Sequence, residues 1–188
     1  MSQSGFPRCV LVDANFLVAW VSPKTSKDDR ARLEFFFSTA EKAKSRIVIP
    51  MPAIAEYLVQ ADAAGLATLA KLERKAFVFL APFDRAAAME CALLDRTAFD
   101  AGGGKKDGVD QPWQKIKVDR QLVAIGKSLG ASLFITGDIG LRKISSRAGI
   151  TAKSVGDLEL PDSARQIILE FAGKNLPKQI SATEIQQI

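Results

Sequence analysis

Residues 8–16, RCVLVDANF, decide the fold of this sequence. The apolar run breaks at Asp13 and resumes at Phe16. Short apolar runs of this kind are typical of strands that are buried on both faces of a parallel sheet. In open α/β sheets the ligand crevice lies just beyond the carboxyl ends of the strands, so Asp13 and Asn15 occupy the position of a site.

The composition predicts a globular protein. Hydrophobic residues make up 47% and charged residues 25% of 188 residues, which suits one domain with a substantial core. We expect this domain over residues 1–160, followed over residues 161–188 by a C-terminal helix and tail that pack on it or extend from it. The net charge of +5 mildly favours a polyanionic partner but fits an ordinary soluble surface equally well.

Histidine is absent from the sequence, and the two cysteines form no metal-spaced pair. This composition excludes Ser-His-Asp and Cys-His catalysis and histidine-ligated zinc. Any chemistry must use carboxylates, lysines, hydroxyls or bound ions. The start of the chain does not resemble a signal peptide, and no apolar stretch approaches the roughly 20 residues that span a bilayer. We therefore expect a cytoplasmic protein.

Predicted strands and helices alternate along the chain. Apolar runs predict strands within residues 8–16, 46–50, 76–81, 132–136 and 150–155. Helical periodicity and breakers predict helices at residues 15–20, 28–43, from 52 onward, 65–75, 84–99, 116–129, 138–147 and 163–172. This alternation predicts a three-layer α/β/α fold with a mainly parallel sheet of roughly five strands.

Three further acids share the kind of position that Asp13 has. Asp138 follows the predicted strand 132–136 and repeats the arrangement at Asp13. Asp119 lies in the predicted first turn of a helix, where an acid is often only a capping residue. Glu56 is the single charged residue between Ile47 and Ala61, so it is either solvated or faces a cleft that holds a positive group.

The predicted fold can bring these four acids into one crevice. Like charges about 4 Å apart repel by about 4 kcal/mol at an effective dielectric of 20, so such a cluster needs protons or cations. Oxygen ligands without histidine or thiolate favour Mg²⁺ or Mn²⁺. One or two such ions could align a water molecule and stabilise charge on a scissile phosphate, with Asn15 and Thr136 as supporting or substrate-positioning groups. This chemistry is that of a phosphodiesterase.

Four segments carry a resemblance to a known family. In order and approximate spacing, the sequence resembles PIN-domain ribonucleases of the VapC toxin type at VDAN (12–15), PAIAE (52–56), VDRQLVAI (118–125) and FITGD (134–138). The match covers about residues 8–155. It implies a PIN-like nuclease domain and a metal-dependent endoribonuclease in which the catalytic residues and metal ligands are Asp13, Glu56, Asp119 and Asp138. It also implies Asn15 and Thr136 beside them, a homodimer, an RNA substrate and a cognate antitoxin.

Two alternatives remain open at this point. One is a catalytically silent PIN-like module that binds RNA or a protein. The other is a phosphatase that resembles haloacid-dehalogenase-like enzymes, with Asp13 as nucleophile and Asn15 in the place of the second acid. The loop around Gly102–Lys106 is expected to be a surface loop, and Arg120, Arg142 and Lys143 are possible phosphate contacts outside the predicted site.

Overall fold

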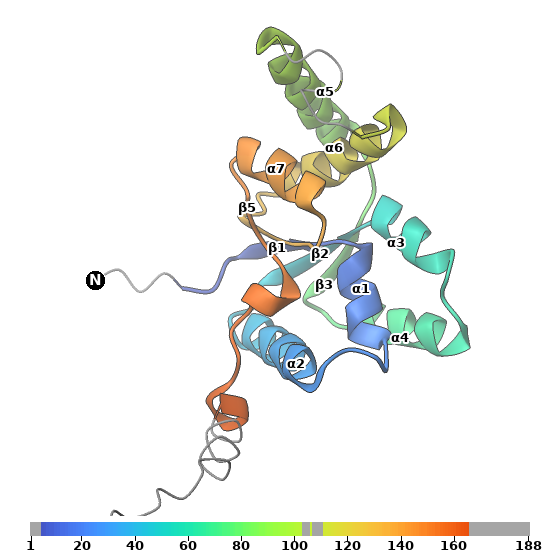
Figure 1. Cartoon of the computed structure of the whole chain (residues 1–188), viewed down its shortest axis with the longest axis vertical. Helices are drawn as coiled ribbons and strands as arrows, with labels where there is room; N and C mark the ends of the chain where they lie inside the picture. The colour runs from blue at the N-terminus through green and yellow to red at the C-terminus, as the bar shows by residue number, and fades with distance from the viewer. Residues whose placement is uncertain (1–4, 103–105, 107–110, 166–188) are drawn as a thin grey trace, which may run out of the picture.

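The structure is a computed structural model that describes residues 5–102, 106 and 111–165 (Figure 1). The predicted C-terminal helix is described only as far as Arg165, and the tail lies outside the described residues. Of the loop around Gly102–Lys106, only its two end residues are described. No helix within the described ranges is long and apolar enough to cross a membrane.

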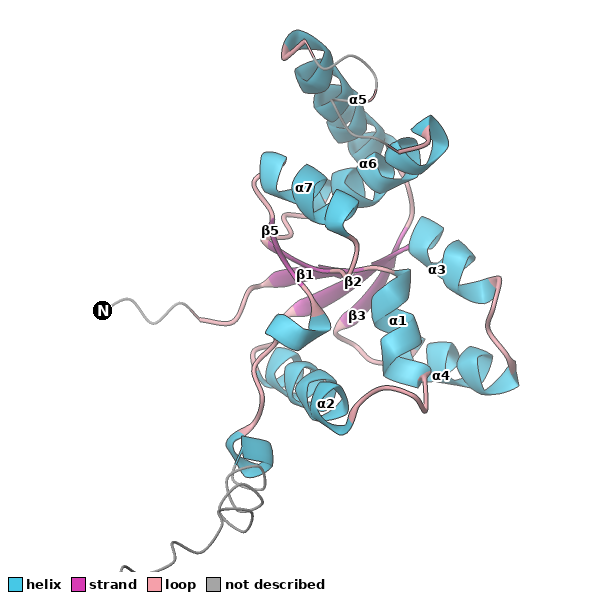
Figure 2. Cartoon of the chain, viewed as in Figure 1, coloured by secondary structure: helices cyan, strands magenta, loops and turns pink. Residues whose placement is uncertain are grey.

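A five-stranded sheet lies at the centre of the molecule (Figure 2). Its strands are β1 (Cys9–Val12), β2 (Arg46–Pro50), β3 (Val78–Ala81), β4 (Leu133–Ile135) and β5 (Thr151–Lys153). The strand order is β3-β2-β1-β4-β5, and every neighbouring pair is parallel. The predicted parallel sheet is confirmed, because each apolar run in the sequence contains one of these strands.

Burial of the strands follows their place in the sheet. All residues of β1 and β4 are buried, whereas the edge strands β3 and β5 are partly exposed. A central parallel strand is covered on both faces, so it needs a continuous apolar run rather than an alternating one. This requirement explains why residues 8–16 decide the fold.

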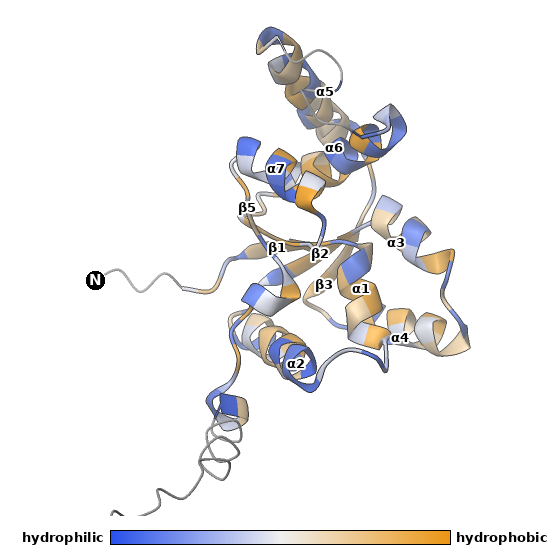
Figure 3. Cartoon of the chain, in the orientation of Figure 1, coloured by the Kyte–Doolittle hydropathy of each residue, from blue (hydrophilic) through white to orange (hydrophobic). Residues whose placement is uncertain are grey.

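Helices cover both faces of the sheet, which confirms the three-layer α/β/α fold (Figures 1 and 2). The lower layer in these views contains α1 (Ala14–Val21), α2 (Lys27–Lys42) and α4 (Ala63–Glu73). Hydrophilic and hydrophobic residues alternate along α2 (Figure 3), whose buried residues include Leu33, Phe36 and Phe37. The upper layer contains α6 (Trp113–Ser128) and α7 (Ile139–Arg147). Helix α3 (Met51–Leu58) follows β2, and α5 (Arg85–Asp100) pairs with α6 and extends away from the sheet.

Several helices begin at an aspartate whose carboxylate accepts a backbone N–H three residues later. These N-caps are Asp13 of α1, Asp62 of α4, Asp84 of α5 and Asp138 of α7. Such a cap satisfies one of the free N–H groups of the first helical turn. Two of the predicted site acids are therefore fixed in place by the backbone of the helix that they start.

Helix α6 begins earlier than the sequence predicted. It starts at Trp113 rather than near Ile116, directly after its N-cap residue Pro112. A proline keeps the residue before it out of the helical conformation, so the helix cannot extend further back. Asp119 therefore lies in the second turn and not the first, so it cannot cap the helix. Its side chain is instead buried within the fold.

Helix α6 packs closely against β1 at Gly126. A Cβ atom added at this position would lie 2.7 Å from Cδ2 of Leu11, which is itself fully buried. A side chain at position 126 would require the Leu11 side chain or the helix to shift. The contact therefore fixes the distance of α6 from the central strand.

We predict that Gly126→Ala destabilises the protein by about 1–3 kcal/mol through overpacking, although alanine favours helix formation by about 1 kcal/mol. Urea denaturation measures the change in the free energy of unfolding. The control is Leu11→Ala, which removes the opposing side chain. In that background Gly126→Ala should cost little or become favourable, and an equal cost in both backgrounds would contradict the predicted clash.

Candidate functional site

The candidate site lies where the strand order reverses. From β1 the chain proceeds to β2 and β3 on one side, then crosses to β4 on the other side of β1. In open α/β sheets this switch point, at the carboxyl ends of the strands, is where ligands bind. Asp13 directly follows β1, and Thr136 directly follows β4, so both stand at this point.

Asp13 is held in a nearly closed environment, with 2% of its surface exposed. Its Oδ1 accepts a hydrogen bond from the backbone N–H of Phe16 at 2.8 Å, and its Oδ2 accepts one from the hydroxyl of Thr136 at 2.6 Å. Burial raises the pKa of Asp13 above its ordinary value, the two hydrogen bonds oppose this rise, and the negative charge of Glu56 adds to it.

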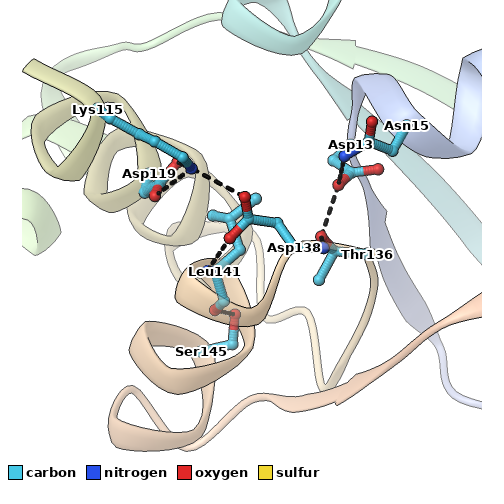
Figure 4. A network of polar contacts seen from close by, with 8 residues as sticks. All are labelled: Asp13, Asn15, Lys115, Asp119, Thr136, Asp138, Leu141 and Ser145. Carbon is cyan, nitrogen blue, oxygen red and sulfur yellow. Dashed lines mark hydrogen bonds and ion pairs between the residues drawn. The ribbon is translucent and has the colours of Figure 1, made fainter. Parts of the chain in front are cut away.

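Thr136 links Asp13 to the next acid. Its hydroxyl donates to Asp13 and accepts a hydrogen bond from the backbone N–H of Asp138 at 3.0 Å (Figure 4). The carboxylate of Asp138 in turn accepts the N–H of Leu141 at 2.9 Å. The ends of β1 and β4 and the start of α7 are therefore joined by one chain of hydrogen bonds.

Lys115 joins Asp119 to Asp138. Its Nζ lies 3.0 Å and 3.3 Å from the two carboxylate oxygens of Asp119 and 2.9 Å from Oδ2 of Asp138 (Figure 4). Sequence reasoning missed this lysine. The signal that could have found it is its position four residues before Asp119 on the same helix, where side chains are neighbours.

The pKa values of Lys115, Asp119 and Asp138 reflect their burial and their mutual attraction. Burial raises the pKa of Asp119, and Lys115 only partly offsets the rise. For Asp138, burial alone would raise the pKa, but the hydrogen bond from Lys115 and that from Leu141 lower it below its ordinary value. Burial alone would lower the pKa of Lys115, yet its hydrogen bonds to the two carboxylates raise it, so the ammonium form is favoured.

Glu56 and Asn15 lie at the same edge of the sheet but are less tightly bonded to the other site residues. Glu56 is exposed in the second turn of α3, and its charge raises the pKa values of Asp13 and Asp119 without a direct bond. Asn15 is also exposed, with its Nδ2 3.5 Å from Oδ2 of Asp13, the limit of a hydrogen bond. The structure thus brings three acids into one bonded network and leaves Glu56 within electrostatic reach of it.

The donor set suits a hard cation, although no ready-made cage is present. Among residues 5–102, 106 and 111–165, no three acidic, cysteine or histidine side chains are gathered closely enough to hold a metal ion. A positive group nevertheless lies between Asp119 and Asp138, namely the ammonium of Lys115. All the neighbouring acceptors are oxygens, the ligands that Mg²⁺ and Mn²⁺ prefer.

The basic residues considered as phosphate contacts differ in their access to the site. Arg120 is buried and donates to Asp95 at 2.6 Å, so its charge is used within the α5–α6 pair. Arg142 donates from Nε to the carbonyl of Thr136 at 3.2 Å and pairs with Asp157 at 3.5 Å. Lys143 is exposed. Arg142 is therefore the base whose position is fixed beside the acids.

The fold and site together define an α/β domain with carboxylates gathered at the switch point of its sheet. Among solved structures, the chain is similar to a chain in the structure of VapBC2 from Rickettsia felis bound to a DNA fragment from its promoter. The TM-score is 0.50 and the sequence identity 14%, and the match covers 78% of this chain and 98% of that chain. Another similar structure is DNA-bound VapBC from Salmonella typhimurium, with a TM-score of 0.48 and 17% identity over 78% and 97% of the two chains. No protein-family model and no curated protein matches.

The chain has a PIN-like fold, which it shares with a chain of the Rickettsia felis VapBC2 structure. The resemblance that the sequence indicated is therefore confirmed at the level of the fold. At 14% identity the likeness shows the architecture of the chain.

We predict that Asp13→Asn stabilises the protein at neutral pH, because removing the buried charge outweighs the loss of one of the two hydrogen bonds that Asp13 accepts. The pKa of Asp13 is raised in the folded protein, so its contribution to stability is present at low pH and is lost as the pH rises through that pKa. The melting temperatures of wild type and variant should therefore converge as the pH falls.

Asp84→Asn is the matched control, since Asp84 is also an N-cap but is exposed. This control should show no comparable gain at neutral pH. A melting temperature of Asp13→Asn below that of wild type at neutral pH would contradict the expected penalty for burying the charge.

Proposed function

We propose that this protein is a Mg²⁺- or Mn²⁺-dependent endoribonuclease and the toxin of a toxin–antitoxin pair. The observation that carries the proposal is the convergence of Asp13, Asp119 and Asp138 at the switch point of the sheet. These acids come from segments that are far apart in the sequence, yet hydrogen bonds through Thr136 and Lys115 connect them. Burying carboxylates costs stability even where a lysine pairs with some of them, so a functional role is the better account of why these acids lie together.

The residues that would hold the metal are Asp13, Glu56, Asp119 and Asp138. A bound divalent ion would lower the pKa of a water molecule and stabilise negative charge on the phosphate. The residues of the chain supply the positioning. Thr136 keeps the carboxylate of Asp13 aligned with the start of α7, where Asp138 stands.

Other side chains at this edge suit an RNA backbone. Arg142 is anchored on the carbonyl of Thr136, and Lys143 is exposed next to it, so both can contact phosphate groups. The amide of Asn15 is exposed beside Asp13 and can position the substrate. Contacts of Arg142 and Lys143 with phosphate groups would provide affinity and not sequence preference.

The proposed partner is a protein antitoxin. The Rickettsia felis structure with a similar fold is a VapBC2 complex, which supports this choice. We also propose a homodimer, as the sequence resemblance implied. RNA and antitoxin would both be met in the cytoplasm.

A second candidate function is a PIN-like module that binds RNA or a protein without cleavage. The position of Lys115 favours this alternative, because its ammonium already neutralises Asp119 and Asp138. Such a module would keep RNA affinity in the presence and absence of divalent ions. Cleavage that depends on a divalent ion distinguishes the enzyme from the module.

We predict that the protein cleaves RNA only with Mg²⁺ or Mn²⁺ and that Asp13→Asn reduces the rate on the order of a hundredfold or more, the size of effect that losing one preorganised electrostatic group has in other enzymes. Cleavage of a mixed RNA pool on denaturing gels measures the rate. Asp84→Asn makes the same chemical change at a distant N-cap and should retain wild-type activity. Binding of RNA without cleavage under either ion would favour the silent module.

We also predict that Mg²⁺ or Mn²⁺ raises the melting temperature, because an ion that binds only the folded state stabilises it. Asp138→Asn should reduce this rise, since it removes one of the proposed ligands. Thermal unfolding with and without millimolar ion measures both effects. An unchanged melting curve together with absent cleavage would contradict the proposed metal site.

A further inference from the structure

We propose that the ammonium of Lys115 occupies a cation position between Asp119 and Asp138 and competes with a divalent metal ion for it. This inference rests on the proposed metal-dependent function and deepens it. Under this inference Lys115 determines the apparent affinity of the site for a divalent metal ion.

The contacts of Lys115 have the form of a bound cation. Its Nζ reaches both oxygens of Asp119, at 3.0 Å and 3.3 Å, and one oxygen of Asp138, at 2.9 Å. An ammonium is a compact point charge with three donors, and here there are three acceptor oxygens. The same oxygens are those that a hard divalent ion would need.

The charge on Lys115 offsets the repulsion between the carboxylates of Asp119 and Asp138. Asp119 is 4% exposed, so its charge is poorly hydrated, and Asp138 lies close enough to share one counter-ion with it. Without a positive group the two carboxylates would repel each other in a poorly solvated place. The lysine therefore allows the acids to lie together in the absence of metal.

Metal and ammonium cannot share this place, because two positive charges would be held against the same oxygens. The lysine is the group that is free to move. Its side chain is 39% exposed and belongs to the first turn of α6, next to solvent. The carboxylates are held, since Asp119 is buried and Asp138 caps α7 through the N–H of Leu141.

A metal ion must therefore displace Lys115 to reach Asp119 and Asp138. The displaced side chain can extend into solvent along its flexible stem. Uptake of metal is consequently an exchange of one cation for another and not the filling of an open cage. The exchange weakens the apparent affinity for metal by the free energy needed to release the lysine.

Calorimetric titration of the full-length protein with Mn²⁺ tests this competition. Lys115→Met removes the charge and keeps most of the stem, and it should lower the apparent dissociation constant for Mn²⁺ by about tenfold. Lys117→Met is the matched control, because it removes the same charge two residues away on α6 from an exposed side chain. It should leave the dissociation constant within about twofold of wild type. Lys115→Arg keeps the charge and should not bind Mn²⁺ more tightly than wild type.

The outcomes separate this inference from the proposed function. Wild type that binds Mn²⁺ as tightly as Lys115→Met does would overturn the competition and leave the metal-dependent function intact. Binding of Mn²⁺ by neither protein would overturn both. If Lys115→Met and Lys117→Met both bind Mn²⁺ more tightly than wild type, the gain comes from the lower net positive charge of the protein. That result would also overturn the competition.

A measurement on the wild type covers the case in which Lys115→Met fails to fold. Nitrogen-detected NMR of lysine ammonium groups should show a Lys115 signal protected from solvent exchange in EDTA, because its protons are held by carboxylates. We expect Mg²⁺ to remove this protection. The signal is assigned by its absence from the spectrum of Lys115→Gln or Lys115→Arg. A protected Lys115 signal that persists when Mg²⁺ is bound would overturn the competition.

Discussion

An ammonium shared by two carboxylates is the interaction on which the rest of the site depends. Lys115 and Asp119 belong to α6, and Asp138 starts α7, so their ion pairs join two helices of the upper layer. From Asp138 the connection continues through Thr136 to Asp13 at the end of β1. One positive charge thus completes a network that spans the carboxyl edge of the sheet. The network explains how acids that repel one another are held in a fixed arrangement.

The strand order determines where this network forms. Because β4 pairs with β1 on the side opposite to β2, the ends of β1 and β4 lie next to each other at the switch point. Aspartates that follow a strand and cap the next helix are fixed in direction by the backbone, as Asp13 and Asp138 are. Acids that follow two neighbouring parallel strands therefore lie at the same edge of the sheet, here linked through Thr136.

Local signals in the sequence were enough to predict the sheet and two of its acids. Buried strands need continuous apolar runs, and a strand ends where such a run meets Asp13 or Gly137-Asp138. Asp119 was predicted as a site residue but in the wrong turn, because the start of α6 depends on Pro112 and not on the apolar stripe. Lys115 was missed because the predicted helix began at residue 116, one residue after it, and because its partner Asp138 lies 23 residues away in sequence. Glu56 lies at the predicted edge, but its exposure depends on how α3 packs, which no local pattern encodes.

The close approach of α6 to β1 has a consequence for how this sequence can change over time. Gly126 and Asp119 are seven residues apart, which is about two helical turns, so they lie on the same side of α6. A larger residue at position 126 would meet the Leu11 side chain, so that either Leu11 or α6, which also carries Asp119, must shift. A position with no functional group thereby limits which side chains the protein can accept, because a side chain there would shift the helix that carries Asp119.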